Sequence, residues 1–398
     1  MSICIIADEN IPFARRAFSE LGTVTTLPGE AITAAAVETA DAVLVRSVTT
    51  VDASLLDGSP VRFVGSATTG TDHVDTEYLN EAGIAFVHAP GANAASVADY
   101  VVAALVELSV RAGEPLRGKT VGIVGCGHIG SRLARRLPAL GLDVLRNDPP
   151  RAAAAQGQAH GFVSLSQVLE AADIVTLHVP LTRTGPHPTY HLIDDSALEA
   201  LSPDTWLVNT SRGAVVDPDG LRAHLEHGPL GAAVIDVWAD EPAPDPKLVR
   251  RVDLATPHIA GYAFDGKVRG TAMVYQALCE ELSVEPTWET EPLLAPQTPD
   301  ALQCTPPDPT LPETEWLHHV TRQMYDIAAD DERLRAGMRG ASDERATHFR
   351  RLRREYPRRR EFAPHQIPAH AVPAGYRPAA EGGLEIQLSA MESRLADT

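Results

Sequence analysis

Residues 120–130 read TVGIVGCGHIG, a short apolar run followed by glycines in the spacing Gly125, Gly127 and Gly130. The apolar run predicts a buried β-strand, and the glycine spacing predicts a tight turn that opens into a helix. In such a turn the first glycine permits the bend, the second lets the backbone approach a pyrophosphate, and the third allows close packing of helix on strand. The stretch therefore predicts the phosphate-binding turn of a dinucleotide-binding domain.

Asp148 lies just beyond the next predicted strand, Asp143–Arg146. This is the position at which a dinucleotide-binding domain carries an acidic residue. A carboxylate there accepts hydrogen bonds from the ribose hydroxyls and repels a 2′-phosphate, so NAD is favoured over NADP. Two plainer interpretations stay open: a glycine turn that merely joins strand to helix, and an Asp148 that is a solvated turn residue. The residues predicted here to bind the cofactor are Gly125, Gly127, His128, Ile129, Gly130 and Asp148.

Apolar strands alternate with helical patterns from Lys119 to Ile259, and a weaker alternation fills residues 1–95. Such alternation predicts an α/β fold with two doubly wound parallel-sheet domains. The predicted strands are Cys4–Ala7, Ala42–Val45, Arg62–Val64, Ile84–Val87, Thr120–Val124, Asp143–Arg146, Ile174–His178, Trp206–Asn209, Ala232–Asp236 and Asp253–Ala255. The predicted helices are Pro12–Leu21, Asp75–Ala82, Ala94–Arg111, Ile129–Leu140, Leu165–Ala171, Ser196–Leu201, Pro218–Glu226 and Lys267–Glu281.

The composition is that of a large globular protein: of 398 residues, 44% are hydrophobic and 22% are charged. The formal charge of −19 argues against nucleic acid or an anionic membrane as the main partner, because both bind clustered positive charge. No signal-peptide pattern or membrane-length apolar stretch is present, which predicts a cytoplasmic protein. The cysteines lie far apart without metal-site spacing, so they predict free thiols and no metal.

The chain changes character after residue 285. Pro286–Pro312 is rich in Pro and Thr and predicts a linker, whereas Glu315–Asp330 is amphipathic and His348–Arg360 is basic. Pro364–Thr398 is rich in Ala and Pro with little periodicity, which predicts partial disorder.

Three polar residues follow later predicted strands, where open α/β sheets place their ligands: Arg212, Glu241 and His258. A guanidinium clamps a carboxylate in bidentate fashion, a histidine takes a proton near neutral pH, and a carboxylate on its other nitrogen fixes the tautomer. Hydride transfer from a 2-hydroxy acid requires these three groups. Asp236 is a further candidate, which would orient the nicotinamide. Each of the three can also be explained as a surface or core residue without a catalytic role.

With these motifs in place, the chain resembles the D-isomer-specific 2-hydroxyacid dehydrogenases through Gly125–Gly130, Asn209–Asp217, Asp236–Pro242 and Thr256–Gly261. The resemblance implies a substrate domain (residues 1–95 with 263–285), a Rossmann NAD-binding domain (residues 96–262) and a small C-terminal α+β dimerisation domain (residues 286–398) of a homodimer. Further implied NAD contacts are Val179, Thr210, Ser211, Arg212, Asp236 and Gly261, where Val179 stands in place of a common threonine.

Other motifs resemble the branch of this family that acts on a small phosphorylated hydroxy acid: Asp8–Pro12, Val45–Thr49, Gly65–His73, Asn147–Arg151 and His258–Tyr262. They imply substrate contacts at Ser47, Thr68 and Tyr262. A phosphate needs cations, for which Arg46 and the run Arg358–Arg360 are candidates, although that run is equally well explained as a solvated basic face. Rival interpretations are a relative that acts on glycerate or 3-phosphoglycerate, and a non-enzymatic NAD-sensing protein.

Overall fold

The computed structural model describes residues 3–154, 161–228, 230–295, 298 and 301–389. Its internal contacts divide the chain into two compact units, residues 1–94 with 262–297 and residues 95–261 with 298–398. Each unit is built on a parallel sheet, which confirms the predicted α/β class. Among the residues described, no helix is both long and apolar enough to cross a membrane.

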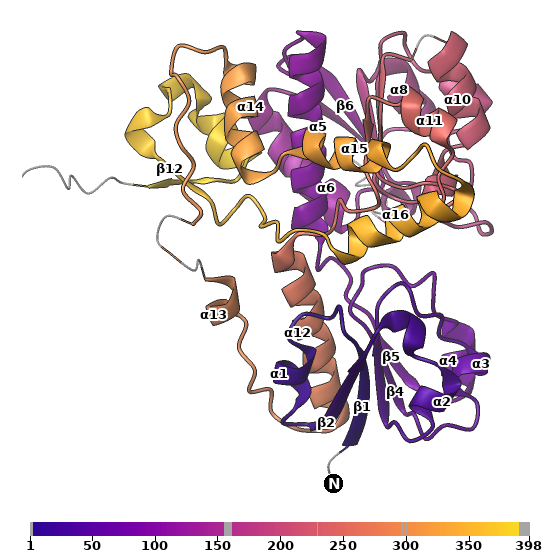
Figure 1. The fold of residues 1–398 in the computed structure, drawn as a ribbon. Coiled ribbons are helices and arrows are strands. Elements are labelled where there is room, and N and C mark those ends of the chain that lie inside the picture. The colour runs from indigo at the N-terminus through magenta and orange to yellow at the C-terminus, as the bar shows by residue number, and fades with distance from the viewer. Residues whose placement is uncertain (1–2, 155–160, 229, 296–297, 299–300, 390–398) are drawn as a thin grey trace, which may run out of the picture. The chain divides into compact units, whose positions relative to one another are not determined.

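The first unit contains a five-stranded parallel sheet with helices on both faces (Figure 1). In sheet order its strands are β2 (Gly22–Leu27), β1 (Ile3–Asp8), β3 (Ala42–Val45), β4 (Phe63–Ser66) and β5 (Ala85–Val87). One face packs against α1 (Ala14–Phe18) and α12 (Phe264–Glu281), and the other against α2 (Ala34–Val37), α3 (Ala53–Leu56) and α4 (Thr76–Glu81). The short helices η1 (Gly29–Ala31) and α13 (Glu291–Leu294) complete this unit.

The strand β2 is absent from the sequence-based prediction. It lies at the sheet edge beside β1, and its residues alternate between half-buried and exposed positions over its first four residues. An edge strand needs fewer apolar residues than a central one, so Gly22–Leu27 contains three threonines instead of a continuous apolar run. The central strand Ala42–Val45, which is buried at every position, was predicted with its observed bounds.

The second unit contains a six-stranded parallel sheet in the order β11-β10-β9-β8-β6-β7. Its strands are β6 (Thr120–Val124), β7 (Asp143–Asn147), β8 (Ile174–Leu177), β9 (Trp206–Asn209), β10 (Ala232–Ile235) and β11 (Leu254–Ala255). After β6 the chain first adds β7 on one side and then β8 on the other, so β6 marks the switch point where such sheets bind ligands. The glycine turn follows this strand directly.

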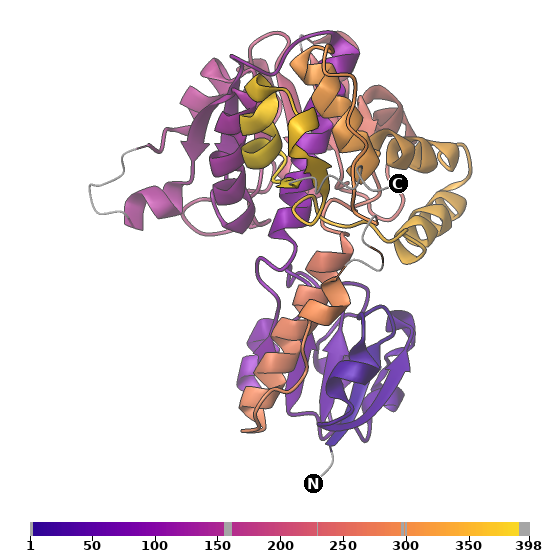
Figure 2. The same ribbon diagram turned by 90° about the vertical axis from the view of Figure 1, so that its left-hand side faces the viewer.

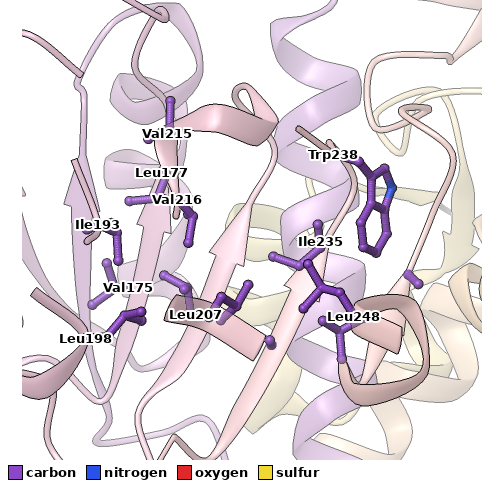
Figure 3. Close-up of a cluster of buried hydrophobic side chains, with 14 of the residues drawn as sticks. Val175, Leu177, Ile193, Leu198, Leu207, Val215, Val216, Ile235, Trp238 and Leu248 are labelled. Atoms are coloured by element: carbon purple, nitrogen blue, oxygen red, sulfur yellow. The ribbon is translucent and has the colours of Figure 1, made fainter. Parts of the chain in front are cut away.

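Helices α5 (Ala94–Ala112) and α6 (His128–Arg136) lie on the side of β6 away from α8, α10 and α11 (Figure 1). The remaining helices of this part are α7 (Pro149–Ala154), α8 (Leu165–Ala171), α9 (Asp195–Glu199), α10 (Pro218–His227) and α11 (Pro246–Arg251), with short turns η2 (Leu137–Leu140) and η3 (Gly213–Val215). Side chains of α8 to α11 form one buried cluster with the strands, part of which is drawn in Figure 3. This cluster includes Trp238, from the loop after β10.

The C-terminal segment packs within the second unit through α14 (Glu313–Met324), α15 (Ile327–Ala336) and α16 (Ser342–Arg354). The stretch Glu315–Asp330, predicted as one amphipathic element, is divided between two helices. The break falls at Asp326, whose side chain accepts a hydrogen bond from the amide of Ala329 and so begins α15. On α14, His318 lies 2.7 Å from the carboxylate of Glu107 on α5, which fixes α14 to α5.

Residues 364–389 are structured, so the partial disorder predicted for Pro364–Thr398 is not found in these residues. They form a small parallel pair, β12 (Gln366–Pro368) with β13 (Gln387–Ser389), the 3-10 helices η4 (Ala369–Ala371) and η5 (Ala374–Tyr376), and the π-helix η6 (Ala379–Gly383). A Cβ at Gly383 would lie 2.4 Å from Leu140 Cδ2, so η6 packs closely on η2 (Figure 2). Close backbone packing of small residues replaces the apolar periodicity that a sequence pattern would reveal. Residues 390–398 lie outside the described part of the chain.

Candidate active site

The backbone of the glycine turn gives each of its three glycines a geometry that suits the role predicted for it. Gly125 adopts φ 89°, a left-handed conformation, and a Cβ there would lie 2.5 Å from the carbonyl oxygen of His178. A Cβ at Gly130 would lie 2.0 Å from the Gly125 oxygen, so close helix–strand packing excludes any side chain. Gly127 has open space around its Cα and precedes α6, which leaves room for a phosphate at the helix N-terminus.

The carboxylate of Asp148 lies at this turn. One of its oxygens accepts a hydrogen bond of 2.8 Å from the amide of Cys126, and the other accepts one of 3.0 Å from the amide of Arg151. The guanidinium of Arg151 in turn contacts the carbonyl of Cys126. Both oxygens of the partly exposed Asp148 are therefore bonded to backbone amides, one of them in the glycine turn, and the open cradle with an adjacent acid fits NAD.

Val179 and Thr210, two further predicted cofactor contacts, follow the neighbouring strands β8 and β9. The side chain of Val179 would lie 2.8 Å from a Cβ at Gly125, so valine packs directly on the glycine turn. Thr210 Oγ1 lies 3.3 Å from Nδ1 of His178, and Thr176 Oγ1 lies 2.9 Å from its Nε2. His178, which the sequence did not single out, thus links the ends of β8 and β9.

Arg212 lies in a turn whose backbone is held by Asn209, the last residue of β9. The Asn209 side chain donates to the carbonyl of Arg212 at 3.0 Å and accepts from the amide of Ser211 at 3.1 Å. Arg212 Nη1 donates to the carbonyl of Ser211 at 2.8 Å, which orients the half-buried guanidinium. The sequence pattern Asn209–Gly213 is thus one compact, internally bonded turn.

His258 and Glu241 form the predicted pair. His258 Nδ1 lies 2.8 Å from Glu241 Oε2, and the other carboxylate oxygen accepts a 2.8 Å hydrogen bond from the amide of Trp238. Burial raises the pKa of the Glu241 carboxyl, but the charge and hydrogen bond of His258, the Trp238 amide and Arg353 on α16 outweigh it, so this pKa lies below its ordinary value. An ionised carboxylate on Nδ1 leaves Nε2 as the ring nitrogen that is available for proton exchange.

Asp236 holds the loop that carries the histidine. Its carboxylate accepts hydrogen bonds from the amides of Ile259 and Ala260, at 2.8 and 2.9 Å, and from the hydroxyl of Thr256 at 2.6 Å. Between these contacts His258 adopts φ 56°, a left-handed conformation that non-glycine residues keep only when their surroundings enforce it. Both Asp236 oxygens thus accept hydrogen bonds from Thr256–Ala260, here called the histidine loop. The sequence did not predict these contacts.

The turns after β9, β10 and β11 meet at one edge of the sheet. A Cβ at Gly213 would lie 2.0 Å from the carbonyl carbon of Trp238, so the turn that carries Arg212 abuts the loop that carries Glu241. Trp238 Nε1 donates to the carbonyl of Thr256 at 3.0 Å, which joins that loop to the histidine loop. Arg212, Glu241 and His258 therefore project from three adjoining loops of a single unit.

The predicted substrate residues Arg46, Ser47, Thr68 and Tyr262 all lie in the first unit. The guanidinium of Arg46 lies 5.5 Å from the centre of the Tyr262 ring and donates to the carbonyl of Asn10 at 2.9 Å. Thr68 Oγ1 bonds Ser66 Oγ at 2.7 Å, and Ser47 is exposed. Lys267 Nζ lies 4.3 Å from the same Tyr262 ring. Lys267 lies in the first turn of α12 and was not among the residues predicted from the sequence.

The run Arg358–Arg360 is not the uniform basic face that the sequence allowed. Arg358 is exposed, whereas Arg359 is buried, with only 8% of its surface exposed. The Arg359 guanidinium donates to the carbonyls of Ile259 and Ala260, at 3.2 and 2.6 Å. This engagement corrects the hypothesis that Arg359 binds a substrate phosphate.

Comparison with known proteins gives the chain its family. The family model described as "D-isomer specific 2-hydroxyacid dehydrogenase, NAD binding domain" matches residues 92–260, and a domain of unknown function matches residues 308–374. The erythronate-4-phosphate dehydrogenase of Salinibacter ruber is 56% identical over 97% of this chain and 99% of that protein. The corresponding protein of Chromohalobacter salexigens is 48% identical over 97% of this chain and 99% of its own.

Among solved structures, a glyoxylate reductase from Paecilomyes thermophila superposes with a TM-score of 0.58 at 25% identity, covering 71% of this chain and 95% of that one. The NAD-binding domain predicted from the glycine turn is thereby confirmed, as is the resemblance on which the wider prediction rested. The chain belongs to the D-isomer-specific 2-hydroxyacid dehydrogenases, in the branch formed by the erythronate-4-phosphate dehydrogenases.

Proposed function

We propose that this dehydrogenase oxidises 4-phospho-D-erythronate to 2-oxo-3-hydroxy-4-phosphobutanoate with NAD⁺, a step of pyridoxal 5′-phosphate biosynthesis. The printed names of its near-full-length relatives support this substrate. The single structural observation that supports the chemistry is the 2.8 Å contact between Glu241 and His258, beside the turn that carries Arg212. A protein that only senses NAD has no need of a histidine poised in this way.

In the proposed reaction Arg212 binds the substrate carboxylate and polarises the C2 oxygen. The O–H and C2–H bonds break while the C2–O bond becomes a carbonyl: the proton passes to His258 Nε2, and the C2 hydrogen leaves with both electrons of its bond. Bound NAD⁺ supplies the acceptor for that hydride. Glu241 stabilises the imidazolium and keeps Nδ1 protonated, while Gly125, Gly127, Gly130 and Asp148 are the residues proposed to hold the cofactor.

A panel assay tests this function directly. NADH absorbance is followed with 4-phospho-D-erythronate, 3-phosphoglycerate, D-glycerate and unphosphorylated D-erythronate as separate substrates. The expected result is the highest kcat/KM with 4-phospho-D-erythronate. A higher value with 3-phosphoglycerate or glycerate would favour the rival assignment within the family, and no NADH formation with any acid would favour the NAD-sensing alternative.

The substrate phosphate is proposed to bind near Tyr262, where Arg46 and Lys267 bring two positive charges to one ring. A phosphate carries up to two negative charges and is bound by point charges such as lysine as well as by guanidinium groups. Ser47 and Thr68, at the carboxyl ends of β3 and β4, are proposed to supply hydroxyl contacts to the same substrate.

Replacing Lys267 by Ala is expected to raise KM for 4-phospho-D-erythronate about tenfold or more, because a hydrogen bond to a charged group contributes roughly 1.5–3 kcal/mol. The turnover of unphosphorylated D-erythronate should change little. Lys247→Ala, on the exposed side of α11, is the matched control and should leave both substrates unaffected. If Lys267→Ala changed KM equally for the phosphorylated and the unphosphorylated acid, this lysine would not bind the phosphate.

We also propose, from the resemblance, a cytosolic homodimer with a substrate domain (residues 1–95 with 263–285), an NAD-binding domain (residues 96–262) and a C-terminal dimerisation domain (residues 286–398). Sedimentation equilibrium should give about twice the chain mass of 42.6 kDa. A monomer at micromolar concentration would contradict the dimer.

A further inference from the structure

The loop that carries the proposed catalytic histidine is held from two sides. On one side Asp236 accepts the amide protons of Ile259 and Ala260. On the other side the carbonyl oxygens of the same two residues accept hydrogen bonds from Arg359, which lies a hundred positions further along the chain. The peptide that directly follows His258 is thus bonded through both its donors and its acceptors.

Arg359 is itself held firmly by the C-terminal segment. Its guanidinium carbon lies 4.1 Å from the centre of the Tyr325 ring and 5.8 Å from that of Tyr356. The hydroxyls of both tyrosines donate to one oxygen of the buried Asp330, at 3.0 and 2.6 Å. Stacking on aromatic faces and a nearby carboxylate stabilise this largely buried cation. This cluster leaves the guanidinium little freedom to rotate.

We propose that Arg359 is a positioning residue for proton transfer: by holding the Ile259 and Ala260 carbonyls it keeps the left-handed backbone from which His258 projects toward substrate. The inference rests on the proposed function, since it concerns the histidine that takes the proton. A left-handed conformation at a non-glycine residue is costly and relaxes when its restraints are removed. Without Arg359, the carbonyls of Ile259 and Ala260 would lose these two hydrogen bonds while Asp236, Trp238 and Glu241 still contacted the loop, and the imidazole would shift relative to the Arg212 turn.

The test uses the full chain with two variants of different donor capacity. Arg359→Met fills a similar volume but donates no hydrogen bond, whereas Arg359→Lys keeps a positive charge and can reach one carbonyl. Misplacement of a reacting group by about 1 Å costs roughly 100-fold in rate. Arg359→Met is therefore expected to lower kcat about 30- to 100-fold and Arg359→Lys about tenfold, with KM and the Kd of NADH changed less than about threefold.

Arg136→Met is the matched control. Arg136 is also a buried arginine that contacts the C-terminal segment, but it bonds Asp99 and the carbonyl of Gly383 and not the carbonyls that follow His258. It should lower the thermal stability and leave kcat within about threefold. An equal fall of kcat in Arg136→Met would show a general structural effect and overturn the assignment.

Each remaining outcome of these measurements either supports or overturns the positioning role of Arg359. Unchanged kcat in Arg359→Met would overturn the positioning role. If that variant fails to bind NADH because it is unfolded, Arg359→Lys decides alone: lowered kcat at unchanged KM supports the role, and parental kcat overturns it. Failure of the proposed function would look different, because the parent chain itself would then form no NADH with any acid and both assignments would fall together.

Discussion

Replacing His258 by Asn is expected to lower kcat for 4-phospho-D-erythronate about 10³-fold, within the 10²–10⁴ that a positioned acid or base contributes. The asparagine side chain can still contact Glu241 in place of Nδ1, but it cannot accept the hydroxyl proton. The deficit should shrink as the pH rises, because hydroxide then competes as proton acceptor. Initial rates of NADH formation over a pH series measure both effects.

Two controls isolate the imidazole from the fold. NADH should bind His258→Asn with an affinity within about threefold of the parent, because the glycine turn and Asp148 are not altered. His224→Asn, on α10, replaces a histidine whose ring bonds the Gly220 carbonyl and should leave kcat unchanged. A His258→Asn protein that keeps more than a tenth of the parental kcat would remove this residue from proton transfer.

The features that were predicted correctly from the sequence are those that depend on residues close together in the chain. The glycine turn, Asp148 and the three later motifs each follow a strand of the parallel sheet, and parallel strands place their carboxyl ends at one edge. Knowing the strands was therefore enough to expect that Arg212, Glu241 and His258 would share an edge. The strands Thr120–Val124 and Trp206–Asn209 were predicted with their observed bounds because nearly every residue in them is buried.

The parts that were missed depend on contacts between distant, irregular segments. Arg359 stands in a run of arginines that resembles solvent-exposed charge, and only the fold places it on the carbonyls after His258. The edge strand Gly22–Leu27 lacks an apolar run, and residues 364–389 pack through small residues and backbone contacts. The alternation in Gly22–Leu27 extends over only four residues, and residues 364–389 show no regular apolar period, so the local signals were short or absent.

Arg212→Gln is expected to lower kcat/KM for 4-phospho-D-erythronate about 10³-fold, which corresponds to roughly 4 kcal/mol of lost transition-state stabilisation. Glutamine removes both the bidentate clamp on the carboxylate and the charge beside the C2 oxygen. Arg212→Lys keeps the positive charge but cannot make the bidentate contact, so its kcat/KM should fall less, about 10- to 100-fold.

Binding of oxalate to the NADH complex distinguishes the clamp from a structural role, because oxalate presents a carboxylate but no hydride donor. Oxalate should bind much more weakly to Arg212→Gln than to the parent, whereas NADH alone should bind equally to both. The matched control is Arg222→Gln on α10, where Arg222 pairs with Asp219 and Asp245 at the surface and should affect neither ligand. If Arg212→Gln bound oxalate like the parent, the carboxylate would have to be held elsewhere. The Asn209–Gly213 turn would then serve only to pack against Trp238.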